Sequence, residues 1–439
     1  MSCDIIIVVI NLSIMKLNGK SLIIVLMLAV LTAAAIWLVH YWSTEAPLGP
    51  DEDLTGPISD VEIKPQDVQE MVASNNRFAL DLYSLYRERE EGNIFYSPYS
   101  LLTALTMTYE GARGQTAEEM ASVFYLPDDQ IRWGGMAGLY NTFNQNDREY
   151  ALDTANAIWP ATNYHFLDDY FSIIERYYRG RIESLDYPAD PEGSRLTINQ
   201  WVEDQTRDKI KDLIPAGLID PLTRLVLTNA IYFKGQWLTE FDQDLTEDAP
   251  FYLNDDQTVT VPMMRRTDDE AIFDYARLDD LEVLSLPYRG EEVAMTIILP
   301  DQDKFEAVEA SLDLDKINYY RSQLEPQRID LYLPRFKIET KYFMNEDLAD
   351  LGMPSAFSAE ADFSGMTGNR DLFISAVIHQ AFAEVNEEGT EAAAATAVVM
   401  LESAAIMSPV FRVDRPFIFL IEHLESGTIL FMGRVSNPS

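Results

Sequence analysis

Apolar side chains recur at helical spacing early in the chain and in strand-like patterns later. A helix is predicted over residues 68–89, where four apolar side chains share one face: Phe78, Leu82, Leu85 and Tyr86. Continuous apolar runs over 225–233 and 294–299 end at turn signals, which is typical of buried strands. Residues 328–333 alternate, as in a half-buried strand. Helices early and strands late predict an α+β domain rather than repeated βαβ units.

Two helix starts are marked by their capping residues. Ser97 precedes Pro98, which predicts an N-cap followed by proline in the first turn. Thr116 stands three residues before Glu119, and this T-x-x-E spacing predicts a capping box.

The N-terminal region divides into three parts by composition. Residues 1–20 carry Lys16 and Lys20 just before the apolar run, which predicts a cytoplasmic n-region. Residues 21–40 are almost entirely apolar and just long enough to span a bilayer, as a signal anchor or as a signal peptide. Residues 41–64 are rich in acidic residues, proline and glycine, which predicts a flexible linker. The remaining domain, 65–439, is then expected to be extracellular or at the cell surface, with the membrane as a partner through the N-terminal segment.

Charge and residue usage exclude several functions. The net charge is −39, and no basic stripe with interleaved aromatics appears, so we expect no nucleic-acid partner. An acidic surface of this kind fits a salt-adapted protein or a general solubility requirement, and both interpretations stay open. Cys3 is the only cysteine and the four histidines are scattered, so no metal site, cofactor or internal disulfide is predicted. The chain is expected to be a monomer.

A stretch near the C-terminus combines one glycine with a run of small side chains. Gly389 can take backbone conformations closed to other residues. In an extended strand, alternate residues would then form an uncharged face, and Glu391 would fall on the other, solvated face. That face comprises Thr390, Ala392, Ala394 and Thr396. This pattern predicts a hinge followed by a segment able to enter a sheet. The alternative is an acidic, alanine-rich surface helix or linker.

Six sequence blocks resemble the serpin family of serine protease inhibitors, in the family's order and over residues 65–439. The resemblance is to inhibitory serpins of the prokaryotic type. The blocks are Asn93 to Ser100 running into Gly111 to Thr116, Ile198 to Glu203 with Lys209 to Ile214, Leu227 to Trp237, Ser375 to Gln380, the hinge stretch, and Arg415 to Phe419 with Leu430 to Val435.

The resemblance implies a serpin fold: a mixed, multi-sheet core with a bundle of helices and an exposed reactive loop. It also implies site residues. The hinge would comprise Glu387, Glu388, Gly389, Thr390, Glu391, Ala392, Ala393, Ala394, Ala395 and Thr396. The loop from Thr390 onward is expected to be exposed before cleavage. A polar cluster called the shutter would comprise Ser97, Ser100, Asn229 and His379. Trp237 would stand at the breach, where insertion begins. His379 and Trp237 also fit ordinary roles in a packed core.

The implied function is inhibition, not catalysis. A serine protease would cleave the loop as a suicide substrate, and the acyl-enzyme would be trapped when the loop inserts into the central sheet. A non-inhibitory serpin-fold binding protein or chaperone is the alternative. An enzyme of another α/β family is a third possibility, for which the chain shows no motif.

The reactive bond is assigned by counting. Fourteen residues on from Gly389 lies Ser403, followed by Ala404, whereas counting back from Arg415 points to Ala405 and Ile406. No lysine or arginine occurs from residue 390 to residue 411. A pocket with a buried aspartate would find no cation there, so elastase-, subtilisin- or chymotrypsin-like targets are predicted.

Overall fold

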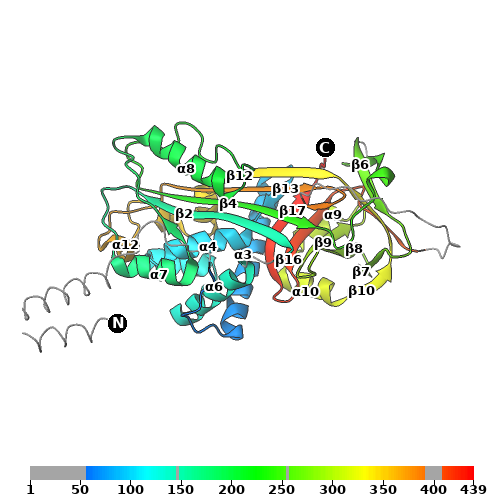
Figure 1. Cartoon of the computed structure of the whole chain (residues 1–439), viewed down its shortest axis with the longest axis horizontal. Coiled ribbons are helices and arrows are strands. Elements are labelled where there is room, and N and C mark those ends of the chain that lie inside the picture. Colours follow the sequence, from blue (N-terminus) through cyan, green and yellow to red (C-terminus); the bar gives the residue numbers. More distant parts are fainter. Residues whose placement is uncertain (1–55, 145–147, 254–256, 391–407) are drawn as a thin grey trace, which may run out of the picture. The chain divides into compact units, whose positions relative to one another are not determined.

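The computed structural model describes residues 56–144, 148–253, 257–390 and 408–439, and separates the chain into two compact units. The larger unit, Pro57–Ser439, contains nearly all described residues and every element considered below. It combines helices with three sheets, which confirms the predicted α+β class (Figure 1).

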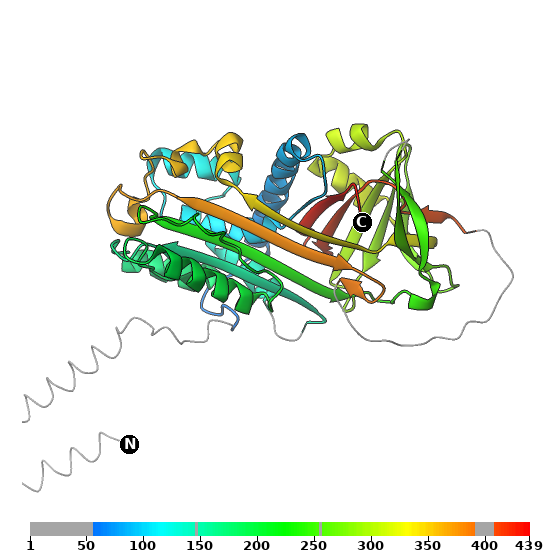
Figure 2. The same ribbon diagram turned by 90° about the horizontal axis from the view of Figure 1, so that it is seen from above.

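A six-stranded sheet forms the long axis of this unit (Figures 1 and 2). We call it the main sheet. Its strands, in spatial order, are β12 (Phe336–Phe343), β13 (Ala376–Val385), β14 (Gly389–Thr390), β4 (Leu225–Gln236), β2 (Tyr150–Pro160) and β3 (Arg181–Ile182). Strand β4 is buried almost throughout, as its unbroken apolar run predicts for a strand covered on both faces.

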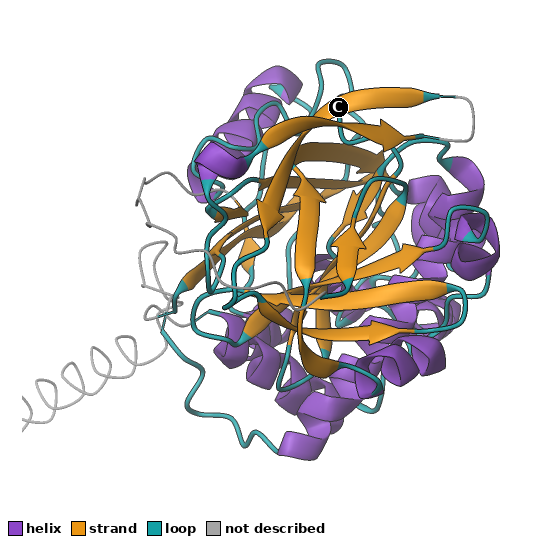
Figure 3. Cartoon of the chain, turned by 90° about the vertical axis from the view of Figure 1, so that its right-hand side faces the viewer, coloured by secondary structure: helices purple, strands orange, loops and turns teal. Residues whose placement is uncertain are grey.

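The main sheet packs over a second sheet of seven strands, and a third of four strands completes the strand layers (Figure 3). The second sheet runs in the order β1 (Ile94–Tyr96), β17 (Thr428–Val435), β16 (Phe417–His423), β9 (Val293–Pro300), β8 (Leu281–Pro287), β7 (Ile272–Arg277) and β10 (Glu325–Arg328). The third runs β15 (Val410–Arg412), β11 (Asp330–Pro334), β6 (Thr258–Arg266) and β5 (Glu247–Tyr252).

Most helices lie around the strand layers (Figure 3). They are α3 (Pro65–Arg89), α4 (Pro98–Tyr109), α5 (Gly114–Val123), α6 (Asp129–Phe143), α7 (Asp168–Tyr178), α8 (Pro191–Gln205), α9 (Phe305–Ala310), α10 (Leu314–Ser322), α11 (Asn345–Leu351) and α12 (Ser364–Thr367), with 3-10 turns η2 (Gln243–Leu245) and η3 (Pro354–Phe357). Helix α4 packs on the inner face of the main sheet, whereas α8 covers the outer face.

Most elements predicted from periodicity are present. The helix over 68–89 and the strands over 225–233 and 294–299 are confirmed as parts of α3, β4 and β9. The Ser97 side chain accepts a hydrogen bond from the Ser100 N–H and caps α4, as predicted. The strand over 328–333 is wrong as one element, because it is divided at Ile329 between β10 and β11 of different sheets.

The capping box at Thr116 is also wrong. Helix α5 begins two residues earlier and has Arg113 at its N-cap. The Glu119 carboxylate accepts hydrogen bonds from the Ser355 N–H (2.9 Å) and hydroxyl (2.8 Å) instead of bonding an N-cap N–H. A tertiary contact therefore replaces the local cap.

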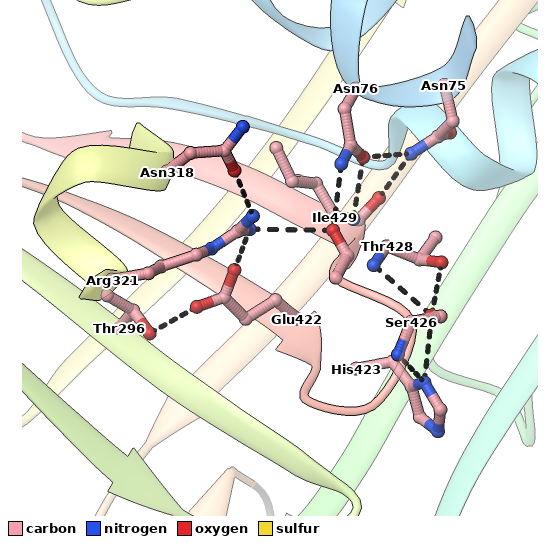
Figure 4. A network of polar contacts seen from close by, with 11 residues as sticks. Asn75, Asn76, Thr296, Asn318, Arg321, Glu422, His423, Ser426, Thr428 and Ile429 are labelled. Carbon is pink, nitrogen blue, oxygen red and sulfur yellow. Dashed lines mark hydrogen bonds and ion pairs between the residues drawn. The ribbon is translucent and has the colours of Figure 1, made fainter. Parts of the chain in front are cut away.

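A polar network fixes the turn between β16 and β17 to two helices (Figure 4). Asn76 on α3 donates to the Gly427 carbonyl (2.8 Å) and accepts from the Ile429 N–H (3.0 Å). Buried Glu422 accepts from the Thr296 hydroxyl (2.5 Å) and pairs with Arg321 of α10. These bonds satisfy buried polar groups at the end of the second sheet.

The chain reaches α3 along the surface of α6. Ile58 is buried, and the Asn141 side chain bonds both its N–H (2.7 Å) and its carbonyl (2.8 Å). The last residues of the expected linker are therefore packed on the domain. No helix within the described residues is long and apolar enough to cross a membrane. The predicted span, 21–40, lies outside them.

Candidate functional site

The predicted hinge begins with a tight turn that has already returned the chain into the main sheet. Asn386 and Gly389 exchange backbone hydrogen bonds, and the Asn386 side-chain oxygen accepts from the N–H groups of Glu388 and Gly389. Strand β14 then lies between β13 and β4, antiparallel to both (Figure 2). Gly389 has a φ of +154°, and a Cβ there would lie 2.1 Å from the Gly235 carbonyl oxygen. Only glycine fits this position.

Thr390 is fully buried in this strand position. Its hydroxyl lies 2.8 Å from that of Tyr288, whose ring stacks on Trp237 with a centroid distance of 4.6 Å. The Trp237 indole N–H donates to the Asn386 carbonyl (2.9 Å), and its backbone N–H donates to the Glu388 carbonyl (2.9 Å). The predicted breach residue and the predicted hinge are thus in direct contact.

The expectation that the loop is exposed from Thr390 onward is wrong at Thr390, which is buried like residues 387–389 before it. The reason is main-chain pairing. Between β13 and β4 the hinge finds partners on both sides, and this satisfies polar backbone groups that sequence patterning cannot assign to a partner.

Two glutamates of the turn are held by side chains from neighbouring segments. Glu387 is 1% exposed, and Arg335 binds both its carboxylate oxygens at 2.7 Å through Nε. The Thr246 hydroxyl also donates to Glu387. Glu388 accepts from the Gln243 amide at 3.3 Å, and its second oxygen has no hydrogen-bond partner within the described part of the chain. The buried charge of Glu387 therefore depends on Arg335.

The four residues predicted as the shutter meet beneath the middle of the main sheet. His379 on β13 accepts from the Ser97 N–H (3.1 Å) and bonds Asn229 on β4 through its other ring nitrogen. Asn229 donates to the Ser100 hydroxyl (2.7 Å). The chain of bonds thus runs from helix α4 across two neighbouring strands. Burial lowers the pKa of His379 to about 3, because a second ring proton would be desolvated and would face the Ser97 N–H.

One further member of this cluster was not found from the sequence. The Asn156 side-chain oxygen on β2 accepts from both Ser100 (2.9 Å) and Asn229 (2.6 Å). Asn156 stands between Ala155 and Ala157, and an asparagine flanked by small apolar residues within a strand is a signal that could have identified it. Tyr288 and Arg335, which hold the hinge, carry no such signal because their roles arise from tertiary contacts alone.

Below the hinge, β4 and β13 pair directly with each other. Seven parallel pairs run from Ala376 beside Val226 to Phe382 beside Tyr232. The strand position between them is thus occupied at one end by β14 and closed over the rest. The reactive-bond candidates Ser403, Ala404, Ala405 and Ile406 lie outside the described residues, as do hinge residues Glu391, Ala392, Ala393, Ala394, Ala395 and Thr396.

Nothing in this arrangement resembles a catalytic or metal centre. Within residues 56–390 and 408–439, apart from the two short undescribed gaps, no group of three or more His, Cys, Asp or Glu side chains could hold a metal ion. What the site offers is a partly occupied strand position controlled by buried polar contacts.

Comparison with known proteins identifies the same architecture. A family model described as "Serpin (serine protease inhibitor)" matches residues 73–438. The leukocyte elastase inhibitor of Bos taurus is 41% identical over 384 residues, which cover 84% of this chain and all of that protein. A serpin-like protein of Thermococcus kodakarensis is 42% identical over 373 residues, covering 84% of this chain and 86% of its own. Mammalian and archaeal relatives match about equally, so the prokaryotic type stays a prediction.

Solved structures agree. Uncleaved ovalbumin aligns with a TM-score of 0.77 at 28% identity, over 84% of this chain and all of that chain. Serpin48 of Tenebrio molitor aligns with a TM-score of 0.75 at 33% identity, over 84% of this chain and 99% of that chain. Human thyroxine-binding globulin, solved with bound thyroxine, aligns with a TM-score of 0.77 at 30% identity, over 85% of this chain and all of that chain.

Replacing Arg335→Met should loosen the hinge. The substitution leaves the Glu387 carboxylate buried without its charged partner, at a cost of about 2 kcal/mol, since the arginine itself is partly exposed. The transition temperature in scanning calorimetry should fall by a few degrees. Arg277→Met is the control, because its pair with Asp301 is a surface contact worth less than about 1 kcal/mol. If both variants lower the transition temperature equally, the Arg335–Glu387 pair stabilises the domain no more than a surface pair does.

Acid should destabilise the domain through His379. Its folded pKa is below the unfolded value near 6.5, so its contribution is complete above pH 6.5 and is lost as the pH falls toward about 3. The expected slope is roughly 1.4 kcal/mol per pH unit within this window. Urea unfolding of the parent, His379→Gln and His165→Gln should show a shallower pH dependence for His379→Gln alone. The exposed His165 is the control.

Proposed function

Because this chain belongs to the serpin family, we propose that it inhibits serine proteases as a suicide substrate. The target protease attacks the reactive loop with its own nucleophile and forms an acyl-enzyme. Cleavage frees the loop after the hinge, and the freed strand inserts into the main sheet before water can release the enzyme. The chain supplies the loop that is cleaved and the sheet that receives it, and no catalytic group of its own.

The observation that carries this proposal is the register of β14. Thr390 pairs with Val385 on one side and with Gly235 on the other. Continued residue by residue, this register places Thr396 between His379 and Asn229, which already lie opposite each other. The incoming strand would therefore separate existing pairs without sliding either neighbour along its axis. The hinge is a two-residue nucleus of a strand for which the sheet is already in register.

The same register explains the run of alanines. Ala392 and Ala394 would face the inner core, beside Phe233 and Ile231, which are completely buried. Ala393 would enter the outer face between Tyr232 and Phe382, which are 2% and 4% exposed beneath α8 and the segment after it. Both faces of the inserted strand are thus crowded, and small side chains are required on both.

Insertion also exchanges the polar contacts of the shutter. The direct bond between His379 and Asn229 would be broken when the strands part. Thr396 would arrive at that level with its hydroxyl on the inner face, as a donor and acceptor for both. A buried polar cluster can then open without leaving its members unsatisfied.

The sheet length constrains the reactive bond. The paired part of β13 and β4 ends at Ala376 and Val226, which the continued register reaches at residue 399. The bond must follow this point for the cut strand to fill the sheet. Ser403–Ala404 and Ala405–Ile406 both satisfy this condition. Their small and apolar side chains, and the likeness to a leukocyte elastase inhibitor, support an elastase-, subtilisin- or chymotrypsin-like target.

The membrane association is part of the proposal. The basic residues before the apolar run over 21–40 favour a domain held outside the cytoplasm. A serpin-fold binding protein that never inserts its loop is the second candidate, because thyroxine-binding globulin, of similar structure, holds a small ligand.

Incubation with a panel of serine proteases tests the function directly. We expect a covalent complex that survives denaturing electrophoresis with at least one elastase- or subtilisin-like enzyme. N-terminal sequencing of the released fragment should give Ala404 or Ile406 as its first residue. Loop cleavage by all enzymes without any complex would favour the second candidate.

Ala394→Arg should convert the inhibitor into a substrate. In the inserted register residue 394 lies between Ala381 and Ile231, both fully buried, so a guanidinium there would lack any partner. A penalty of about 3 kcal/mol on insertion slows it roughly a hundredfold relative to deacylation. Protease should then be released active after cutting the same bond.

Glu391→Arg is the matched control. It would lie beside Lys234 and Glu384, both half-buried on the outer face, and should still trap protease. If the two arginine variants trap equally well, the register is wrong.

Ser403→Arg should redirect specificity. The guanidinium can pair with the buried aspartate of a trypsin-like pocket, so the association rate with trypsin should rise at least about tenfold. Ala405→Arg tests the alternative position with the same assay. A parent protein that already traps trypsin faster than elastase would contradict both assignments.

A further inference from the structure

Residues 57–64, here called the docking segment, lie against two helices of the domain before α3 begins. They precede residue 73, at which the match to the family model starts. Ile58 is 2% exposed, whereas its neighbours Pro57, Ser59 and Asp60 are exposed. A segment outside any helix or strand can bury one residue in this way only if other elements bond its main chain. Helices α6 and α7, which pack side by side, provide these bonds (Figure 1).

Asn141 on α6 binds the docking segment through its main chain. The Asn141 side-chain oxygen accepts from the Ile58 N–H (2.7 Å), and the side-chain nitrogen donates to the Ile58 carbonyl (2.8 Å). One amide thus pairs with both main-chain groups of one residue, as a residue of a neighbouring strand does in an antiparallel ladder. Recognition of this kind takes its affinity from the extended main chain and its specificity from the side chain that is buried, here Ile58.

Glycines open a path for the segment along α6. Gly134, Gly138 and Asn141 follow one another at spacings of four and three residues and therefore share one face of the helix. A Cβ on Gly134 would lie 3.4 Å from the Glu62 carbonyl oxygen, and one on Gly138 would lie 3.0 Å from a methyl carbon of Ile63. Glycine is a poor helix former, and this close approach, which α3 shares, explains its presence here.

Helix α7 adds a charged contact two residues after Ile58. The Arg176 Nε lies 2.9 Å from the Asp60 carboxylate, and a second guanidinium nitrogen donates to the Asp60 carbonyl (3.0 Å). The two side chains are 50% and 59% exposed, so solvent screens the pair and it contributes less than the bonds of Asn141. The contact still distinguishes an acidic residue at this position from a basic one.

We propose that the α6–α7 face is a peptide-binding site and that the docking segment is its ligand. The ligand class is an extended peptide in which a branched aliphatic residue is followed two positions later by a carboxylate, as in Ile58-Ser59-Asp60. The chain fills the site with its own segment, and the same sequence supplied as a separate peptide should fill it once the internal copy is displaced. The inference does not rest on the proposed function, since none of these contacts involves the hinge or the shutter.

Hydrogen exchange of the full chain measures docking directly. The Ile58 amide should be protected in the parent, and Asn141→Leu should raise its exchange rate about tenfold, the factor expected when its hydrogen bond is lost. Thr142→Val is the matched control, because the Thr142 hydroxyl bonds the Gly138 carbonyl of its own helix and not the docking segment. An Ile58 amide that exchanges at the same rate in all three proteins would overturn the inference.

A peptide of residues 56–64 tests binding in trans. Ile58→Asp in the full chain places a charge at the buried position, which should displace the internal segment and leave Asn141 and the glycines of α6 in place. Saturation-transfer NMR should then detect the peptide on this variant. The parent should not bind it, because a short connection holds the internal copy at an effective concentration on the order of millimolar.

The results decide between a binding site and an incidental contact. Peptide binding to Ile58→Asp, absent in the parent and lost again in the double variant Ile58→Asp/Asn141→Leu, would support the site. Equal binding to all three proteins, or binding to none, would overturn it. Ile58 lies outside the main core cluster, so Ile58→Asp should fold; if it does not, exchange at Ile58 in Asn141→Leu still decides. Neither readout uses a protease, so failure of the proposed function would leave both unchanged.

Discussion

The structure depends on how the backbone groups of β4 and β13 are satisfied. Along seven residue pairs they bond each other. At one end β4 pairs instead with both residues of β14, and β13 pairs with Thr390. Both arrangements satisfy the main chain, and a longer strand between them would add a complete second ladder of hydrogen bonds. The closed sheet is thus one of two ways to pair the same strands. Under the proposed function, which one is populated depends on whether the loop is free to enter.

The polar contacts around this seam suit a sheet that opens. An apolar seam would expose hydrophobic surface on parting, whereas His379, Asn229, Ser100 and Asn156 can exchange partners. The contacts that hold the hinge differ from those that cover the outer face of the main sheet. Charge pairing and aromatic stacking hold the hinge through Arg335, Tyr288 and Trp237, while α8 and the segment after it cover the outer face of the main sheet. The residues that hold the hinge in place are therefore different from those whose hydrogen bonds can be exchanged when the sheet opens.

Sequence patterning predicted the fold class, the strand β4 and the cap at Ser97, because each leaves a local or compositional trace. The residues that meet at the shutter came from the resemblance to the serpin family. Patterning did not predict that Glu387 to Thr390 are buried, since a small-residue hinge is compatible with either an exposed loop or a sheet. Arg335 and Tyr288 were missed for a related reason: their partners lie more than fifty residues away in the chain. The failed capping box at Thr116 shows a tertiary contact, Glu119 with Ser355, prevailing over a local motif.

The crystal structure of the protein after a single cut in its reactive loop is the most direct measurement of the central claim. The account predicts that β4 and β13 no longer touch, that Thr396 lies between Asn229 and His379, and that neither neighbouring strand has shifted in register. A cleaved protein in which His379 still bonds Asn229 directly, with the cut loop outside the sheet, would contradict it.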